Sequence, residues 1–113
     1  EETRGLIGAG ELARMKESAT LVNVGRGELV DEEALARALR DGEIRGAGLD
    51  VFREEPLPPS SPLWALENAL ITPHVAGQSP GYWDRELELI EENVGRYRAG
   101  EPLRNRVDKS RGY

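Results

Sequence analysis

Three short apolar segments place the strongest limit on what this chain can fold into. Residues 20–24, 44–52 and 69–72 are rich in aliphatic side chains and are bounded by glycine, proline or polar residues. Such segments predict strands, and the first of them, residues 20–24, reads as a strand that is buried on both faces. Helical patterns alternate with these segments, which indicates a parallel sheet in an α/β fold.

Three helices are predicted around these strands. A short helix covers residues 10–16, and a longer one follows Asp31, a good N-cap residue, and stops at Gly42. The last helix covers residues 79–99, with Ser79 as the N-cap and a proline at the first helical position. The apolar stripe of this last helix is typical of a core or interface face and consists of Trp83, Leu87, Ile90, Val94 and Tyr97.

The composition describes a soluble globular protein. The chain has 113 residues, of which 38% are apolar and 32% charged, with a formal net charge of −6 and no cysteine. The absence of a long apolar run argues against a signal peptide or membrane span, so we expect no membrane partner and a cytoplasmic location. The 15 Lys and Arg residues are interleaved with 21 Asp and Glu residues. Because phosphate binding needs a basic face, we exclude nucleic acid as a partner. No metal site is predicted.

The beginning of the chain predicts that it is part of a longer protein. Residue 1 is not methionine, and the single methionine, Met15, falls inside a helical pattern. If further strands precede Glu1, the sheet has an open edge and an uncovered apolar face in this chain. Surfaces of that kind drive association, so we expect a dimer or larger assembly.

Arg26 follows the first predicted strand, in the segment Asn23–Gly27. In an open α/β sheet, ligands bind beyond the carboxyl ends of the strands, and a guanidinium can hold a carboxylate with two hydrogen bonds. Arg26 is therefore a candidate for binding an anionic substrate. The alternative is an arginine on a surface turn, paired with water or a nearby carboxylate.

An acid and a histidine fall at the ends of the other two strands. Asp50 is costly to bury unless it is paired, so it is either a structural hydrogen-bond acceptor or a site residue. His74 is the only histidine, and a lone histidine is usually structural. However, parallel strands bring Arg26, Asp50, Glu55 and His74 to one edge, which favours an acid/base site that binds a carboxylate.

These segments together resemble the D-isomer-specific 2-hydroxyacid dehydrogenases. Asn23–Gly27 is similar to the arginine motif of that family, Gly46–Leu57 to its acid motif, and Thr72–His74 to its histidine motif. The resemblance extends from Thr3 to about Val107 and rests on the order and spacing of all three motifs. It implies the second half of a Rossmann-like, parallel-sheet NAD(P)-binding domain with a C-terminal helix.

The resemblance also implies a role for each site residue. Arg26 would bind the carboxylate and carbonyl of the substrate, His74 would exchange a proton with the 2-hydroxyl or 2-oxo oxygen, and Glu55 would pair with His74. Formate is excluded as substrate, because the formate branch of the family has glutamine at the Glu55 position. The cofactor, NAD or NADP, would be contacted by Val24, Gly25, Arg26, Asp50, His74, Ala76 and Gly77, with Asp50 beside the nicotinamide.

A domain division follows from the same resemblance. Residues 1–100 would be the C-terminal half of the cofactor domain, including the final helix at 79–99, and residues 101–113 would be a polar tail. The glycine-rich phosphate loop, G-x-G-x-x-G, is expected upstream of Glu1, because no buried strand precedes Gly8–Gly10.

The implied activity is hydride transfer between NAD(P)H and C2 of a small 2-oxo or 2-hydroxy acid, catalysed by a parent protein that is a homodimer. We expect this chain alone to be inactive. The alternative is a non-catalytic binding protein or scaffold, since the family also contains transcriptional corepressors that keep the three functional residues.

Overall fold

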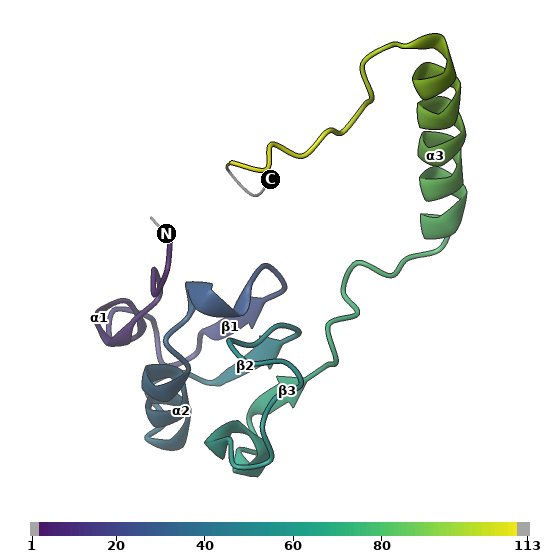
Figure 1. Ribbon diagram of the computed structural model, residues 1–113. Coiled ribbons are helices and arrows are strands. Elements are labelled where there is room, and N and C mark those ends of the chain that lie inside the picture. The colour runs from purple at the N-terminus through teal and green to yellow at the C-terminus, as the bar shows by residue number, and fades with distance from the viewer. Residues whose placement is uncertain (1–2, 111–113) are drawn as a thin grey trace. The chain divides into compact units, whose positions relative to one another are not determined.

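The computed structural model describes residues 3–110, which divide into two compact units. The first unit ends at Gly77 and contains a parallel sheet with helices, and the second begins at Gln78 and contains one long helix with the tail that follows it (Figure 1). The predicted α/β fold with a parallel sheet and a C-terminal helix is confirmed.

The sheet has three parallel strands in the order β1-β2-β3. β1 is Thr20–Asn23, β2 is Gly46–Leu49 and β3 is Ala69–Ile71, so each strand is shorter than the apolar segment that predicted it. The register aligns Leu21 with Ala47 and Ala47 with Ala69. All three strands therefore present their carboxyl ends at the same edge of the sheet.

The remaining elements of the first unit lie before the first strand and in the connections between the strands. α1 (Ala9–Leu12) precedes the sheet, and α2 (Glu32–Arg40) links β1 to β2 after the 3-10 helix η1 (Gly27–Leu29). β2 and β3 are linked by the proline-rich segment and the 3-10 helix η2 (Pro62–Ala65). α1 is shorter than the predicted 10–16 helix, because hydrogen bonds spanning only three residues follow its single turn.

α2 supplies the main cover of the sheet. The Asp31 carboxylate accepts a hydrogen bond from the Ala34 N–H at 3.0 Å, which confirms Asp31 as the N-cap. Gly42, at φ 73°, follows the end of the helix. The buried side of α2 packs with the strands in a core that consists of Leu12, Val30, Ala34, Leu35, Ala36, Ala38, Leu39, Ile44, Ala47, Leu49, Phe52, Leu57 and Leu63.

Only one face of the sheet is covered by elements of the first unit. Side chains alternate along each strand, so Leu21, Ala47 and Ala69 share the core face, where α1 and α2 lie (Figure 1). On the opposite face, Val22 is 65% exposed and Leu70 is 69% exposed. The prediction that the first strand is buried on both faces is therefore wrong within residues 3–77, because none of their elements lies over that face.

The last helix, α3 (Tyr82–Ala99), begins later than predicted. Its N-cap is Gly81, at φ 73°, and not Ser79, whose carbonyl accepts a hydrogen bond from the Tyr82 N–H in the preceding turn. The left-handed conformation of Gly81 interrupts the chain before the helix can start. The predicted C-terminal stop is correct, since Gly100 caps the helix at φ 70°.

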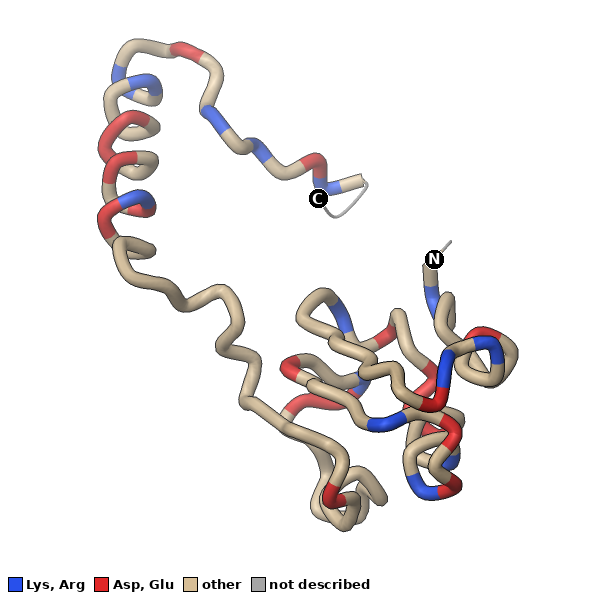
Figure 2. Tube along the Cα trace, turned by 180° about the vertical axis from the view of Figure 1, so that it is seen from behind, with Lys and Arg blue, Asp and Glu red and all other residues tan. Residues whose placement is uncertain are grey.

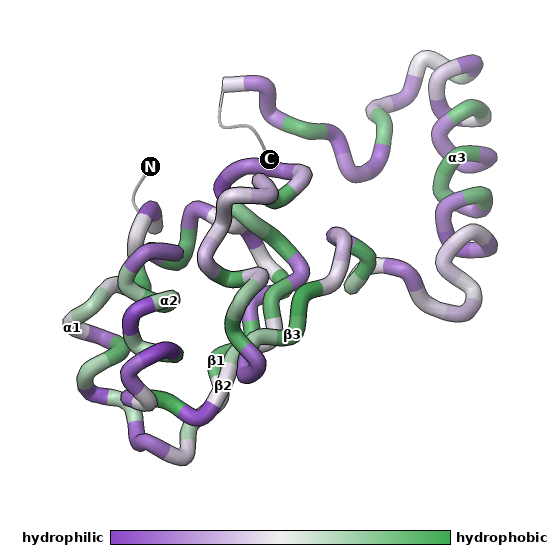
Figure 3. The backbone as a smooth tube through the Cα atoms, turned by 90° about the horizontal axis from the view of Figure 1, so that it is seen from below, coloured by the Kyte–Doolittle hydropathy of each residue, from purple (hydrophilic) through white to green (hydrophobic). Residues whose placement is uncertain are grey.

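The apolar stripe of α3 is not buried within the second unit. Apolar and polar residues alternate along the helix (Figure 3), and the tail that follows it leaves five apolar side chains exposed, namely Trp83, Leu87, Ile90, Val94 and Tyr97. The interpretation of this stripe as a core or interface face stays a prediction. No helix in residues 3–110 combines the length and apolar character needed to cross a membrane.

The segment after α3 is fastened to the helix by polar contacts. The Arg104 guanidinium donates to the Glu92 carboxylate at 2.6 Å, and the Arg104 N–H donates to the Asn93 side chain at 2.8 Å. Hydrogen bonds from Arg104 and from Arg96 lower the pKa of Glu92 below its ordinary value. Basic and acidic residues are interleaved along α3 (Figure 2), which allows these pairs to form.

Gly27 brings the loop after β1 against the loop after β2. A side chain at this position would overlap the backbone of Phe52 and the amide nitrogen of Arg53. Glycine is required here because two backbone segments approach each other closely. The loop that carries Arg26 is thereby placed beside the loop that carries Glu55.

This close approach predicts a large effect of Gly27→Ala on stability. We expect the free energy of unfolding, measured by chemical denaturation, to fall by about 3 kcal/mol, since the backbone must move to admit a methyl group. Gly10→Ala in α1 is the matched control, because a side chain there meets no atom within 4 Å. Equal stability of the two variants would contradict the proposed packing.

Candidate active site

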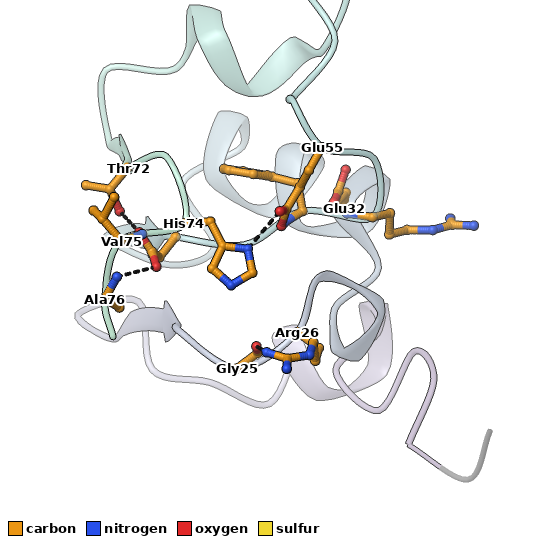
Figure 4. A network of polar contacts seen from close by, with 11 residues as sticks. Gly25, Arg26, Glu32, Glu55, Thr72, His74, Val75 and Ala76 are labelled. Carbon is orange, nitrogen blue, oxygen red and sulfur yellow. Dashed lines mark hydrogen bonds and ion pairs between the residues drawn. The ribbon is translucent and has the colours of Figure 1, made fainter. Parts of the chain in front are cut away.

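The site lies where three loops meet at the carboxyl edge of the sheet. Arg26 lies in the loop after β1, Asp50 and Glu55 follow β2, and His74 follows β3. Figure 4 shows Arg26, Glu55 and His74 at this edge. The sequence prediction that these four residues share one edge agrees with the topology. The functional roles of these four residues stay predictions.

Asp50 organises the loop that carries His74. Its side chain is buried, with only 3% of the residue exposed. The carboxylate accepts three hydrogen bonds: from the Thr72 hydroxyl at 2.5 Å, from the Val75 N–H at 2.9 Å and from the Ala76 N–H at 2.7 Å. The hydrogen bond from Thr72 is the largest cause that lowers the pKa of Asp50, and those from Val75 and Ala76 also lower it, against the opposing effect of burial. Asp50 therefore acts as a structural hydrogen-bond acceptor in this chain, and its role as a site residue stays a prediction.

His74 pairs with Glu55 as the resemblance implied. The His74 Nδ1 atom lies 2.7 Å from the Glu55 Oε2 atom. The other Glu55 oxygen accepts from the Phe52 N–H at 2.9 Å, so the carboxylate is held from both sides. The hydrogen bond with His74, followed by that from Phe52, lowers the pKa of Glu55. An ionised carboxylate at Nδ1 fixes the proton on that nitrogen.

The ring of His74 lies between Glu55 and the loop of Gly25 and Arg26, and its second nitrogen faces away from Glu55 (Figure 4). His74 adopts φ 54°, a left-handed conformation that is uncommon for a residue other than glycine. The Asp50 hydrogen bonds to residues on both sides of His74 hold this conformation. Nε2 is thus left available for a ligand.

Arg26 is exposed and has no carboxylate partner among the described residues. One of its guanidinium nitrogens donates to the Gly25 carbonyl at 2.8 Å, and its remaining N–H groups are free to bind an anion. The alternative of an arginine paired with a nearby carboxylate does not apply within residues 3–110. No group of three or more His, Cys, Asp or Glu residues in that range is arranged to hold a metal ion.

The residues predicted to contact the cofactor lie along the same edge. Val24 and Gly25 follow β1, whereas Ala76 and Gly77 end the His74 loop, and all four are exposed. Their small or apolar side chains suit a planar ring. The Asp50 carboxylate, which can accept about four hydrogen bonds and uses three, has capacity left for an amide donor such as a carboxamide. The residues present therefore fit a nicotinamide.

A pocket of about 500 Å³ adjoins the pair formed by Glu55 and His74. Its other lining residues are mostly apolar and are Asp50, Phe52, Pro56, Leu57, Trp64, Ile71, Thr72 and Pro73. Such a pocket beside a polar pair suits a small organic ligand.

Sequence reasoning missed two residues that shape this edge. Thr72 supplies a hydrogen bond to Asp50, and Asn23, only 6% exposed, hydrogen-bonds to the loop of Arg26. Both residues are polar and stand at the end of an apolar segment, directly before a loop, and this pattern could have identified them. Such a residue needs a partner when it is buried, and the nearest free groups belong to that loop.

Comparison with known proteins decides the family. The sequence profile of the family described as D-isomer specific 2-hydroxyacid dehydrogenase, NAD binding domain, matches residues 1–76. The chain belongs to this family. The expected nicotinamide cofactor, NAD or NADP, agrees with that description.

Two relatives of this chain have names that state an activity. The chain is 47% identical over 109 residues to a glyoxylate reductase from Korarchaeum cryptofilum, a match that covers 96% of this chain and 33% of the relative. It is 57% identical over 75 residues to glyoxylate/hydroxypyruvate reductase B from Erwinia tasmaniensis, covering 66% of this chain and 23% of that protein. The chain thus spans about a third or less of these two relatives.

A solved structure of similar sequence supports the fold. The chain is 51% identical to a D-isomer specific 2-hydroxyacid dehydrogenase from Xanthobacter autotrophicus in complex with NADPH and MES. The TM-score is 0.82, and the match covers 99% of this chain and 46% of that one. The Rossmann-like character of the 2-hydroxyacid dehydrogenase sheet is thereby confirmed.

The hydrogen bonds of Asp50 predict how stability depends on pH. Because folding lowers the pKa of Asp50 below its ordinary value of 3.8, the ionised carboxylate stabilises the fold above that pH. This stabilisation is lost as the pH falls through the pKa of the folded state. Thr72→Val removes the largest cause of the lowered pKa, so we expect this variant to lose less stability on acidification and to complete the loss at a higher pH.

The measurement is the free energy of unfolding between about pH 6 and pH 2, which spans the ordinary carboxylate range. Thr20→Val is the matched control, because the Thr20 hydroxyl contacts Arg45 and no carboxylate. Identical pH dependence for both variants would show that Thr72 does not stabilise ionised Asp50.

Proposed function

We propose that the protein to which this chain belongs transfers a hydride between NAD(P)H and C2 of a small 2-oxo or 2-hydroxy acid. The observation that carries this proposal is the pair of His74 and Glu55 on the same sheet edge as the unpaired Arg26. The names of the glyoxylate reductase relatives favour glyoxylate or hydroxypyruvate as substrate.

Arg26 binds the carboxylate of the substrate in this proposal. Its guanidinium is exposed and unpaired, and the planar arrangement of N–H donors matches the two oxygens of a carboxylate. Binding the carboxylate places the neighbouring C2 carbonyl at a fixed distance from the loop. A lysine in the same place would provide the charge but not the paired donors.

His74 exchanges a proton with the oxygen on C2. Glu55 accepts the hydrogen bond from Nδ1 at 2.7 Å, which orients the ring and leaves Nε2 to face the substrate. In the reductive direction, Nε2 donates a proton to the carbonyl oxygen as it gains negative charge. In the oxidative direction, the same atom accepts the proton of the hydroxyl group.

The nicotinamide, when bound, supplies or accepts the hydride. Arg26 and His74 would lie near the reacting carbon, and the other contacts would come from Val24, Gly25, Asp50, Ala76 and Gly77. Asp50 contributes mainly by holding Ala76 and Val75 in place. We propose that the phosphate groups of the cofactor bind outside this chain, so that the isolated chain is inactive.

The parent protein is proposed to be a cytoplasmic homodimer. The exposed apolar stripe of α3 and the open face of the sheet support association. The lack of cysteine fits a reducing compartment. The proposed domain division assigns residues 1–100 to the cofactor domain and 101–113 to a tail.

The direct test is turnover by the full-length protein with NADH or NADPH and a panel of 2-oxo acids that includes glyoxylate and hydroxypyruvate. We expect oxidation of the reduced cofactor that depends on the 2-oxo acid. If the protein binds the nicotinamide cofactor but reduces none of these acids, the non-catalytic scaffold becomes the better account.

Arg26→Lys tests the substrate-binding role in the same assay. Loss of the paired hydrogen bonds to a charged group costs about 2–3 kcal/mol, so kcat/KM should fall roughly 30- to 150-fold. Arg40→Lys, at an exposed position in the last turn of α2, is the matched control. Unchanged kcat/KM of Arg26→Lys on every accepted 2-oxo acid would exclude this role.

A further inference from the structure

We propose that Asn23 is a positioning residue that holds Arg26 in place for substrate binding. This inference rests on the proposed role of Arg26. Asn23 is the last residue of β1, is only 6% exposed, and uses both ends of its side-chain amide in hydrogen bonds to the loop of Arg26. Any effect of Asn23 on the reaction must therefore pass through the residues it contacts.

Both ends of the Asn23 side-chain amide contact the loop of Arg26. The Oδ1 atom accepts a hydrogen bond from the Gly25 N–H at 3.1 Å, and the Nδ2 group donates to the Arg26 carbonyl at 3.0 Å. The Asn23 amide thus stabilises the turn that contains Gly25 and Arg26. The Arg26 guanidinium in turn donates to the Gly25 carbonyl at 2.8 Å, so the same turn also orients the side chain.

The two ends of this loop are fixed to the segment that follows β2 and carries the acid residues. The Asn23 carbonyl accepts a hydrogen bond from the Asp50 N–H at 3.0 Å, and Gly27 lies against the backbone of Phe52. Phe52 also donates to Glu55, which pairs with His74. The amide of Asn23 therefore sets the path of the chain between two fixed points, and Arg26 lies on that path.

Few other residues could replace this amide. Aspartate lacks the donor for the Arg26 carbonyl, and serine is too short to span both groups. A side chain at Gly25 would lie 3.1 Å from Leu29 and 3.6 Å from the Asn23 amide oxygen, so a small residue is needed beside the amide. Asn23 and Gly25 thus act together to shape the turn.

The test uses the full-length protein with Asn23→Ala and Asn23→Asp. Loss of the hydrogen bond to Arg26 should raise KM for the 2-oxo acid about tenfold, with smaller effects on kcat and on KM for the nicotinamide cofactor. Asn68→Ala is the matched control, because Asn68 donates one hydrogen bond of 3.0 Å to the Leu39 carbonyl at the opposite end of the sheet. This control should lower the melting temperature and leave both KM values unchanged.

An unchanged KM for the 2-oxo acid in the folded Asn23 variants would overturn the positioning role. If Asn23→Ala does not fold, Asn23→Asp, which keeps the shape and the acceptor, decides the question alone. Arg26→Lys, measured in parallel, separates the two claims. If Arg26→Lys leaves kcat/KM unchanged, the proposed role of Arg26 fails; if only the Asn23 variants leave KM unchanged, the role of Asn23 alone is overturned.

Discussion

The buried carboxylate of Asp50 is the interaction on which the arrangement of the site depends. An ionised carboxylate in an apolar surrounding is strongly unfavourable unless hydrogen-bond donors compensate for the lost water. Here the donors are the Thr72 hydroxyl and the N–H groups of Val75 and Ala76, which lie on both sides of His74. The end of β2 therefore dictates the path of the chain after β3.

Two acids that are close in sequence have different structural roles in this arrangement. Asp50 is buried and shapes the His74 loop, whereas Glu55 is partly exposed and pairs with the imidazole itself. The loop of Arg26 reaches the same edge because Gly27 packs against the backbone that follows Asp50. The loops after β1 and β3 thus both contact residues 50–55, the segment that follows β2. The imidazole of His74 and the guanidinium of Arg26 are thereby held at the same edge of the sheet, as the proposed function requires.

Much of this could be predicted from the sequence, and the failures have physical reasons. The strands and α2 were predictable because their apolar periodicity and the cap at Asp31 are local signals. The exposure of Val22 could not be predicted in this way. An apolar segment shows that a strand is suited to burial, but its actual burial depends on which elements lie over the sheet. The start of α3 was misplaced because Ser79 is a good N-cap by type, but the left-handed Gly81 lies closer to the helix. The role of Asp50 stayed open because its partners lie more than 20 residues away.

Amide hydrogen exchange at Val75 and Ala76 tests the central claim, that Asp50 holds the His74 loop, most directly. Both residues lie in a loop outside regular secondary structure, yet their N–H groups donate to a buried carboxylate. We predict that both amides are protected from exchange, whereas the neighbouring Gly77 amide, which donates no hydrogen bond in the described part of the chain, exchanges rapidly. Exchange of Val75 and Ala76 as fast as that of Gly77 would contradict the account.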